Sequence, residues 1–341
     1  MKNKKINIGI AGLGQIGGRL YKEILSKKND IAVKTGKIVN IVGVSAKNVN
    51  KKRNFKINKK KFYKNPLDIS NNPNIDIVFE LIGFSGGISK KIVETALKNK
   101  KHVITANKAL IAKNGDYLSY LAEKNRVNLE FEASVGGGIP VLRTIKDGLA
   151  TNKINKVVGI LNGTCNYILS KMETSKESFS NVLKKAQKLG YAELRNPKFD
   201  LDGTDTLSKV RILSALAFNN KISKNNCLMN GIENIELEDI QIADKLNFKI
   251  KLLGITEIIN NKLFERVHPC LIKKDTYIAN INGVMNAVIL EGKPVGESVL
   301  QGEGAGPGPT SSALMSDLLS ILRGNIKYPF GIPFNKRKKI N

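Results

Sequence analysis

Residues 1–133 alternate short, nearly continuous apolar runs with amphipathic stretches. The apolar runs predict strands at 6–12, 37–45, 75–83, 102–106 and 127–133. The stretches after the first, third and fourth runs have the spacing of helices. Strands that are apolar along their whole length are typical of a parallel sheet covered on both faces. We therefore expect an α/β domain here, with the Lys- and Asn-rich segment 46–74 at its surface.

The pattern changes from residue 134 onward. Helical spacing is mixed with strand patterns, the helices near 139–149, 163–172, 178–189 and 204–218 and the strands near 153–160, 248–258 and 284–290. This mixture predicts an α+β domain over 134–308. A Gly- and Pro-rich loop at 302–310 precedes a last amphipathic helix, SSALMSDLLSILRG, which ends at Gly324. We expect residues 309–341 to return to the first domain.

The length of 341 residues and the apolar content of 41% allow two domains, each with a core. No apolar run reaches the ~20 residues that cross a bilayer. The basic start, MKNKKINIGIAGLG, is broken by glycines, so it predicts a first strand and not a signal peptide. Cys165, Cys227 and Cys270 lie far apart, which argues against disulfides or structural zinc and favours a cytoplasmic protein without a membrane partner.

The net charge of +27 raises the question of a nucleic-acid partner. Most of the basic residues are lysines, and they are spread along the chain apart from a cluster at 51–61 and a short tail at 336–339. An AT-rich genome places lysine and asparagine at neutral surface positions. We therefore expect no nucleic-acid partner, and a DNA-binding protein is the competing non-enzymatic hypothesis.

The motif GLGQIG follows the first predicted strand and opens the first predicted helix, with Gly12, Leu13, Gly14, Gln15, Ile16 and Gly17. The first glycine of such a motif permits a tight turn, and the second lets the backbone approach a pyrophosphate. The third lets helix and strand pack closely, and the helix N-terminus faces the phosphates. With the repeated strand–helix pattern around it, the motif predicts a Rossmann-type domain that binds a dinucleotide.

The second predicted strand bears on the choice of cofactor. Sites that prefer NAD usually place Asp or Glu at the end of this strand, where the carboxylate binds the ribose hydroxyls. No acidic residue occurs between Asp30 and Asp68, and Lys47 follows the strand. A 2'-phosphate would be favoured there, so we expect NADP(H) to be preferred, with NAD(H) possible. The alternative is that Lys47 belongs to the general lysine excess.

Three further blocks carry a resemblance, ITANKALI at 104–111, FEASVGGGIPVLRTIKDGL at 131–149 and GILNGTCNYIL at 159–169. From residue 6 to about 333 the chain resembles homoserine dehydrogenases of bacterial type. That family reduces L-aspartate 4-semialdehyde to L-homoserine with NAD(P)H, on the route to threonine and methionine. The resemblance implies a second domain for substrate binding and dimerisation, hence a homodimer. Many members carry a C-terminal regulatory ACT domain, which we expect to be missing here, with weak or absent threonine inhibition.

Asp205 and Lys209 are spaced i, i+4, so on a helix they share one face. Reducing an aldehyde requires a hydride from the nicotinamide and a proton for the developing alkoxide. A lysine in a partly dry cleft gives up its proton more readily than in water. The resemblance implies that Lys209 is the acid/base and that Asp205 orients it and contacts the substrate. An ordinary surface ion pair is the alternative for this spacing.

The resemblance also implies that Glu193 holds the substrate's α-ammonium group. The chain departs from the family pattern nearby, because Asp205 lies twelve positions after Glu193, whereas the family has eleven positions from this glutamate to this aspartate. The usual acidic residue two positions after the glutamate is Arg195 here. We therefore expect the loop between Glu193 and Asp205 to be one residue longer than in the family. Asp200 and Asp202 remain further candidates for substrate contacts.

Three residues match family positions beside the nicotinamide. Lys108 follows a predicted strand, where an open α/β sheet places its ligands, and the resemblance makes it a second proton-transfer lysine that also binds substrate and cofactor. Ser85 matches a hydroxyl residue beside the cofactor. Gly306 matches the point where the backbone lies against the nicotinamide. Simple turn chemistry is the alternative for Ser85 and Gly306.

The segment EASVGGGI at 132–139 resembles the family's monovalent-cation loop. The resemblance implies an all-oxygen shell from the Glu132 carboxylate and the carbonyls of Val135, Gly137 and Ile139. Such a shell suits Na⁺ or K⁺ better than zinc. The glycines would equally serve as a hinge between two domains.

Cys165 offers an alternative chemistry, since aldehyde dehydrogenases act through a cysteine thioester. The only histidines, His102 and His268, are not evident partners for that thiol, and His268 has the sequence context of a structural residue. A semialdehyde dehydrogenase that uses Cys165 is therefore the second enzyme hypothesis.

Overall fold

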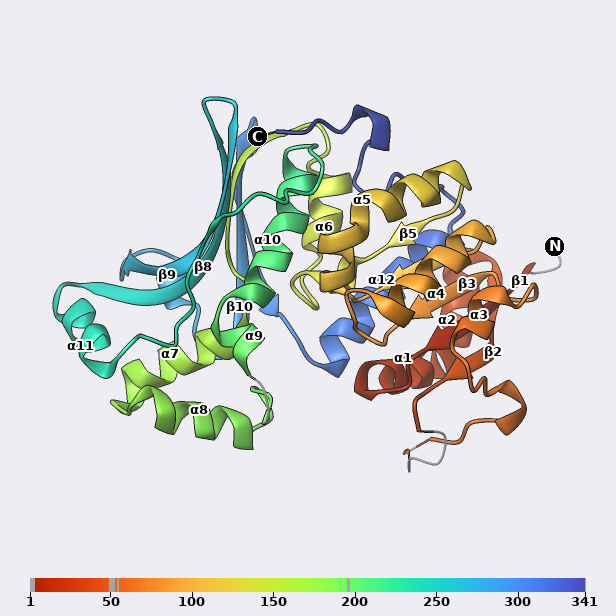
Figure 1. Cartoon of the computed structure of the whole chain (residues 1–341), viewed down its shortest axis with the longest axis horizontal. Coiled ribbons are helices and arrows are strands. Elements are labelled where there is room, and N and C mark those ends of the chain that lie inside the picture. Colours follow the sequence, from red (N-terminus) through yellow and green to blue (C-terminus); the bar gives the residue numbers. More distant parts are fainter. Residues whose placement is uncertain (1–3, 49–52, 54, 195–196, 341) are drawn as a thin grey trace. The chain divides into compact units, whose positions relative to one another are not determined.

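The computed structural model describes residues 4–48, 53, 55–194 and 197–340 (Figure 1). The chain forms two compact units. Unit 1 comprises Met1–Gly138 with Gly306–Arg337, and unit 2 comprises Ile139–Ala305 with Lys338–Asn341. The first unit thus ends at residue 138, five residues after the expected boundary at 133, and its returning segment begins at residue 306, three residues before the expected position 309.

Unit 1 is built on a five-stranded parallel sheet in the order β2-β1-β3-β4-β5 (Figure 1). The parallel arrangement is as predicted, because strands that are apolar on both faces need cover on both faces. All four residues of β3 are buried. The strands are β1 Lys4–Ala11, β2 Lys37–Ser45, β3 Ile77–Glu80, β4 His102–Thr105 and β5 Leu129–Glu130.

Helices cover this sheet, including one from the end of the chain. In α12, Leu314, Leu318 and Ile321 recur at helical spacing and join the core cluster that includes Leu20 and Ile24 of α1. Each buried Leu or Ile contributes about 1.5–3 kcal/mol. The elements are α1 Gln15–Ser26, α2 Lys28–Thr35, η1 Lys59–Lys61, α3 Leu67–Asn71, α4 Gly87–Lys98, α5 Lys108–Lys124, η2 Glu132–Ser134, α12 Pro307–Leu322 and η5 Phe334–Lys336.

Unit 2 contains a six-stranded sheet in the order β11-β10-β6-β8-β9-β7. All its pairs are antiparallel except that of β7 with β9. The strands β9 and β11 and the two-residue β7 were not predicted from the sequence. The strands are β6 Lys153–Ile160, β7 Leu228–Met229, β8 Phe248–Ile259, β9 Lys262–Lys273, β10 Met285–Lys293 and β11 Gly296–Glu303.

Helix α10 packs closely on this sheet. A Cβ added to Gly254 of β8 would lie 2.5 Å from Val210 and 3.0 Å from Thr206, so the glycine permits the close approach. None of the helices in the described part of the chain is long and apolar enough to span a membrane. The helices of unit 2 are α6 Val141–Arg143, the π-helical turn η3 Thr144–Gly148, α7 Gly163–Ser175, α8 Phe179–Lys188, α9 Lys198–Leu201, α10 Thr204–Ala217, α11 Leu237–Lys245 and η4 Ile278–Asn280.

Candidate active site

The glycine turn lies at the carboxyl end of β1, where the strand order reverses between β1 and β3. Open α/β sheets bind ligands in the crevice at such a point. Gly12 has φ +111°, and a Cβ there would lie 2.6 Å from the Leu81 carbonyl oxygen. A Cβ on Gly17 would lie 1.9 Å from the Gly12 carbonyl oxygen, whereas one on Gly14 would meet no atom within 4 Å. The turn is therefore tight at both ends and open in the middle.

The other residues of this motif begin α1. Leu13 is buried, Gln15 is the exposed first residue of the helix, and Ile16 packs against the core of unit 1. Gly14 precedes the helix without a side-chain cap, and the first turn contains no acidic residue. An uncapped helix N-terminus next to open space suits an anionic ligand. These residues fit a dinucleotide pyrophosphate.

Three more predicted cofactor residues come after the carboxyl ends of β2, β3 and β4, at the same edge of the sheet as the glycine turn. Lys47 is exposed two residues after β2, and the neighbouring Lys51 and Lys52 lie outside the described residues. Ser85 is half-buried between β3 and α4, where its carbonyl accepts from Asn114 Nδ2 at 3.0 Å. Lys108 is half-buried at the first position of α5.

Glu80, at the carboxyl end of β3, organises this edge of the sheet and was not predicted from the sequence. It is fully buried, and its Oε1 accepts from the backbone N–H groups of Ile82 at 2.9 Å and Gly83 at 3.2 Å. Its Oε2 accepts from Thr105 Oγ1 at 2.8 Å and from Asn107 Nδ2 at 3.3 Å. A charged residue at the end of an apolar strand was the available signal.

Asn107 links Glu80 to Lys108. Its Oδ1 caps α5 by accepting from the Leu110 N–H at 3.0 Å, while its Nδ2 donates to Glu80 and to the Phe84 carbonyl. Asparagine is a favoured N-cap because its side chain satisfies a backbone N–H of the first turn. The start of α5, and with it Lys108, is therefore positioned by the buried carboxylate.

The proposed cation loop follows β5. Glu132 is 2% exposed, and its backbone N–H donates to Oδ2 of the buried Asp317 on α12 at 3.0 Å. Gly137 has φ +52°. Ile139 begins unit 2, and its carbonyl accepts from the Val141 N–H at 2.8 Å.

No cluster of three or more His, Cys, Asp or Glu that could hold a metal occurs among the described residues. A buried carboxylate in a glycine-rich loop fits a hard monovalent cation, with Glu132, Val135 and Gly137 in unit 1. The buried Asp317 nearby was not anticipated.

Lys209 and Asp205 form a buried ion pair on α10. Lys209 Nζ lies 2.7 Å from Asp205 Oδ2, and each residue is 8% exposed. Lys209 also donates to the Leu161 carbonyl at 2.5 Å. The pair is not an ordinary surface pair, since both side chains are removed from water and Lys209 is held by oxygens from two segments of unit 2.

Asn162 connects this pair to Asp200. Its Nδ2 lies 2.9 Å from Asp200 Oδ1 and 3.1 Å from Asp205 Oδ2. Its Oδ1 accepts from the Cys165 N–H at 2.8 Å, so the same residue caps α7. The amide donor holds the two carboxylates together. Asp200 was a candidate from the sequence, whereas Asn162 was not predicted.

Glu193 lies in the loop between α8 and α9. Its side chain is exposed, and its carbonyl accepts from Gln187 Nε2 at 3.1 Å. The loop is attached to α7 because Thr164 Oγ1 donates to the Tyr191 carbonyl at 2.6 Å. Arg195 lies outside the described residues.

Cys165 cannot serve as the nucleophile, which corrects the second enzyme hypothesis. The residue is fully buried, and its Sγ donates to the Asp200 carbonyl at 3.2 Å. Burial, with the nearby Asp200 and Asp205 carboxylates, raises the pKa of the thiol well above its usual value. A reactive thiolate needs the opposite environment.

Gly306 immediately precedes α12 and has φ +106°, a conformation that favours glycine. It is the first residue of the returning segment of unit 1. Gly306 therefore forms the bend at which the chain enters the last helix.

A parallel sheet with a glycine turn at its switch point, and a buried lysine–carboxylate pair on a helix of unit 2, define a nicotinamide-dependent oxidoreductase. The family model described as homoserine dehydrogenase matches residues 140–319, and that of the homoserine dehydrogenase NAD binding domain matches residues 12–132. The chain belongs to the homoserine dehydrogenase family. It is an NAD(P)-dependent oxidoreductase that acts on a CH–OH group in amino-acid biosynthesis.

Individual relatives agree with this assignment. The homoserine dehydrogenase of Neisseria gonorrhoeae is 40% identical over 320 residues, which cover 94% of this chain and 73% of that protein. That of Pseudomonas aeruginosa is 39% identical over 326 residues, with 96% and 74% covered. The crystal structure of a homoserine dehydrogenase from Thiobacillus denitrificans matches with a TM-score of 0.93 at 36% identity, covering 100% of this chain and 80% of that chain.

Proposed function

We propose that Lys209 donates the proton when L-aspartate 4-semialdehyde is reduced to L-homoserine. The supporting observation is the position of its ammonium group, which is buried and bonded to Asp205 and to the Leu161 carbonyl. A dinucleotide held at the glycine turn would supply the hydride. Lys209 then protonates the alkoxide oxygen, and in the reverse direction it accepts the hydroxyl proton.

The carboxylates around Lys209 suit a substrate that carries an ammonium group. Asp205 orients Lys209 directly, and Asp200 is joined to Asp205 through Asn162. We assign Asp205, Asp200 and Glu193 to the substrate's α-ammonium and hydroxyl ends. Lys108 is proposed as a second lysine for substrate, cofactor and proton transfer, on a helix start fixed by Asn107.

The decisive experiment is NADPH oxidation with L-aspartate 4-semialdehyde, with wild type beside Lys209→Ala. The variant should lose about 10²–10⁴-fold in kcat, the usual contribution of a positioned acid. Lys188→Ala, at an exposed position of α8, removes a lysine from the same unit and serves as the control. Unchanged turnover in Lys209→Ala would remove the proposed acid.

We further propose NADP(H) as the preferred dinucleotide, with Lys47 near the 2'-phosphate. The support is the place of Lys47, exposed just past β2 on the edge that carries the glycine turn. Lys47→Glu should lower the ratio of kcat/KM for NADPH over NADH at least tenfold, since it replaces attraction of the phosphate by repulsion. An undiminished NADPH preference would contradict this assignment.

A monovalent cation, Na⁺ or K⁺, is proposed at the loop with Glu132, Val135, Gly137 and Ile139. When bound, the ion would neutralise the buried Glu132 carboxylate. Glu132→Gln should abolish any dependence of thermal stability on Na⁺ or K⁺ at constant ionic strength. Choline chloride provides the ionic-strength control.

We also propose a cytoplasmic homodimer that pairs through unit 2. Val299, Ile289, Val158 and Ile255 lie opposite one another in register across β11, β10, β6 and β8 and therefore share one sheet face. Val299 is 38% exposed. Light scattering should show a dimer for the wild type and a shift toward monomer for Val299→Glu.

A further inference from the structure

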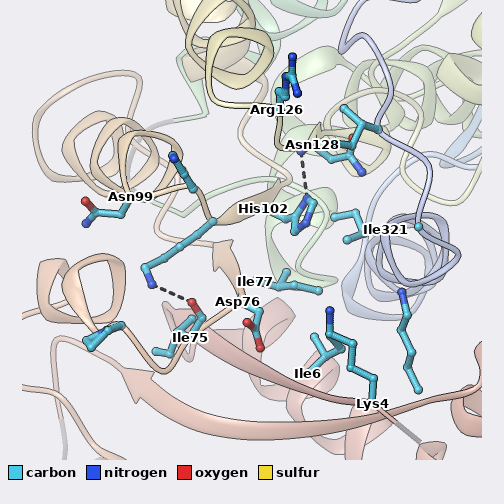
Figure 2. Close-up of a pocket in the computed structure, with 16 residues that line it drawn as sticks. Lys4, Ile6, Ile75, Asp76, Ile77, Asn99, His102, Arg126, Asn128 and Ile321 are labelled. Carbon is cyan, nitrogen blue, oxygen red and sulfur yellow. Dashed lines mark hydrogen bonds between the residues drawn. The ribbon is translucent and has the colours of Figure 1, made fainter. Parts of the chain in front are cut away.

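Unit 1 contains a cavity of about 410 Å³ at the edge of its sheet opposite the glycine turn (Figure 2). Lys4, Lys37, Ile77 and His102, which are the first residues of β1, β2, β3 and β4, line it. Because the strands are parallel, these first residues share one edge. The proposed dinucleotide residues follow the other ends of the same strands, so this cavity is separate from the cofactor site.

The lining is strongly cationic. It includes Lys4, Lys37, Lys100, Lys101 and Arg126, against one carboxylate, Asp76. In the described part of the chain, none of these five cations has a carboxylate within ion-pair distance. The whole chain has 56 basic and 29 acidic residues. The ratio of five cations to one carboxylate in the cavity lining is therefore well above the ratio in the whole chain.

Hydrogen bonds fix the walls of the cavity. The buried Lys101 donates to the carbonyls of Asn72 at 2.6 Å and Ile75 at 2.7 Å. Asp76 Oδ2 accepts from the Asn7 N–H at 2.7 Å. The only lining carboxylate is thus already engaged with the backbone, and the shape of the floor does not depend on a ligand.

A second wall comes from the end of the chain. The side chain of the buried Asn128 donates to the Asn325 carbonyl at 3.0 Å and accepts from the Lys327 N–H at 2.8 Å. These bonds hold Gly324 and Ile326 as lining residues. The cavity is therefore preformed, which lowers the cost of ordering it around a ligand.

His102 adds a neutral donor. Its Nδ1 accepts from the Asn128 N–H at 3.0 Å, so the proton of the neutral ring lies on Nε2. Burial lowers the pKa of His102, which keeps the ring neutral at physiological pH. Figure 2 shows the ring among the lining residues, between Arg126 and Asp76.

Helix ends offer a competing explanation for some of these cations. Lys100 and Arg126 follow the C-termini of α4 and α5, and α12 also ends at this edge. Each terminus carries roughly half a negative charge. Three termini and Asp76 together offset roughly two to three of the five positive charges. The buried Glu130 carboxylate, which does not line the cavity but acts on His102, offsets one further charge, so a net positive charge of roughly one to two remains.

We propose that this cavity binds a small, multiply charged anion that bears phosphate. Its volume falls in the range of small-ligand pockets and excludes a nucleic-acid duplex. Several lysines and one arginine around a neutral N–H donor suit the oxygens of a phosphate ester or a diphosphate. The site is independent of the proton donor proposed for unit 2.

Calorimetric titration with inorganic pyrophosphate tests the proposal. The protein is first saturated with NADPH, so that the probe cannot occupy the glycine turn, and the ionic strength is held constant. The variant Lys100→Asn/Arg126→Asn removes two charges. Both residues have positive φ, +56° and +54°, which asparagine tolerates well, so folding is preserved.

The control is Lys91→Gln/Lys113→Gln. It removes two exposed lysines from the same helices, α4 and α5, away from the cavity. Wild type and control should bind one pyrophosphate with similar affinity, and the Lys100/Arg126 variant should bind at least tenfold more weakly. Absence of one-to-one binding by wild type, or an equal loss in both variants, would overturn the proposal.

Discussion

The amide nitrogen of Asn162 lies 3.1 Å from Oδ2 of Asp205, the oxygen that also contacts Lys209. Asn162 precedes α7, so its position is set by the capping bond to Cys165. One side chain therefore starts a helix and supplies the hydrogen bond that joins two carboxylates of the proposed site. Substitutions can separate these two roles.

Asn162→Asp keeps the helix cap but replaces the amide donor by a third carboxylate. Repulsion within the cluster should raise the pKa of one carboxyl group, because like charges disfavour one another's ionised forms. We expect kcat/KM to fall about 10–100-fold at pH 7 and to recover partly at lower pH. The measurement is the pH–rate profile together with the melting temperature.

Asn162→Ser is the matched control, because serine also caps a helix but adds no charge. It should lose activity without the recovery at low pH. If Asn162→Asp has the wild-type rate and pH profile, the amide does not organise the carboxylates.

Cys165→Ser should leave turnover nearly unchanged. The serine hydroxyl can donate to the Asp200 carbonyl as the thiol does, and the family chemistry requires no thiol at this buried position. We expect kcat within about threefold of wild type, which corresponds to less than about 1 kcal/mol. Steady-state kinetics check this, and a loss of a thousandfold or more would restore the thioester hypothesis.

The glycines of the cofactor turn should respond differently to alanine. Gly17→Ala places a methyl group 1.9 Å from the Gly12 carbonyl oxygen, so the free protein should lose about 1–3 kcal/mol of stability. Gly14→Ala meets no neighbour within 4 Å, so the free protein should lose only about 0.5–1 kcal/mol, because alanine is a poorer N-cap than glycine.

NADPH titration distinguishes the two alanine variants further. The methyl group of Gly14→Ala should occupy the space that the pyrophosphate approaches and weaken NADPH binding at least tenfold. Melting curves without cofactor and fluorescence titration with NADPH provide the two readouts. Wild-type NADPH affinity in Gly14→Ala would place the dinucleotide elsewhere.

Lys251 of β8 is buried in unit 2 without contacting the proposed site. Its Nζ donates to the Ile281 carbonyl at 2.6 Å, to Asn166 Oδ1 at 3.0 Å and to Asn282 Oδ1 at 3.1 Å. Burial lowers the pKa of Lys251 to about 8. In the unfolded chain the pKa is near its ordinary value of 10.5.

Between these two pKa values the unfolded chain holds more protons than the folded protein. Stability should therefore rise with pH through this window, by about 2 kcal/mol from pH 7.5 to 9.5. Lys251→Met, which keeps the length of the side chain, should lack this rise. Urea unfolding of both proteins at the two pH values measures the difference, and parallel pH dependences would contradict the assignment.

Periodicity was enough to predict the central elements of both units. The structure reproduces the predicted limits of β2, an edge strand that pairs with β1, and of β6, which lies between β10 and β8, because each contains an apolar run. Strand β11, GESVLQGE, was missed since it lies at a sheet edge and has no apolar run. These residues form a strand because they pair with β10, and the local sequence of β11 does not reveal this pairing.

The candidate site shows the same difference between features that depend on local sequence and features that depend on packing. The sequence by itself determined the glycine turn and the i, i+4 spacing of Asp205 and Lys209, because both depend on local backbone geometry. Only the tertiary structure placed Asn162 beside Asp205, 43 residues away, and Asp317 beside Glu132, 185 residues away. Local spacing cannot encode such contacts, because the packing of whole helices and strands decides which distant polar groups share a buried position.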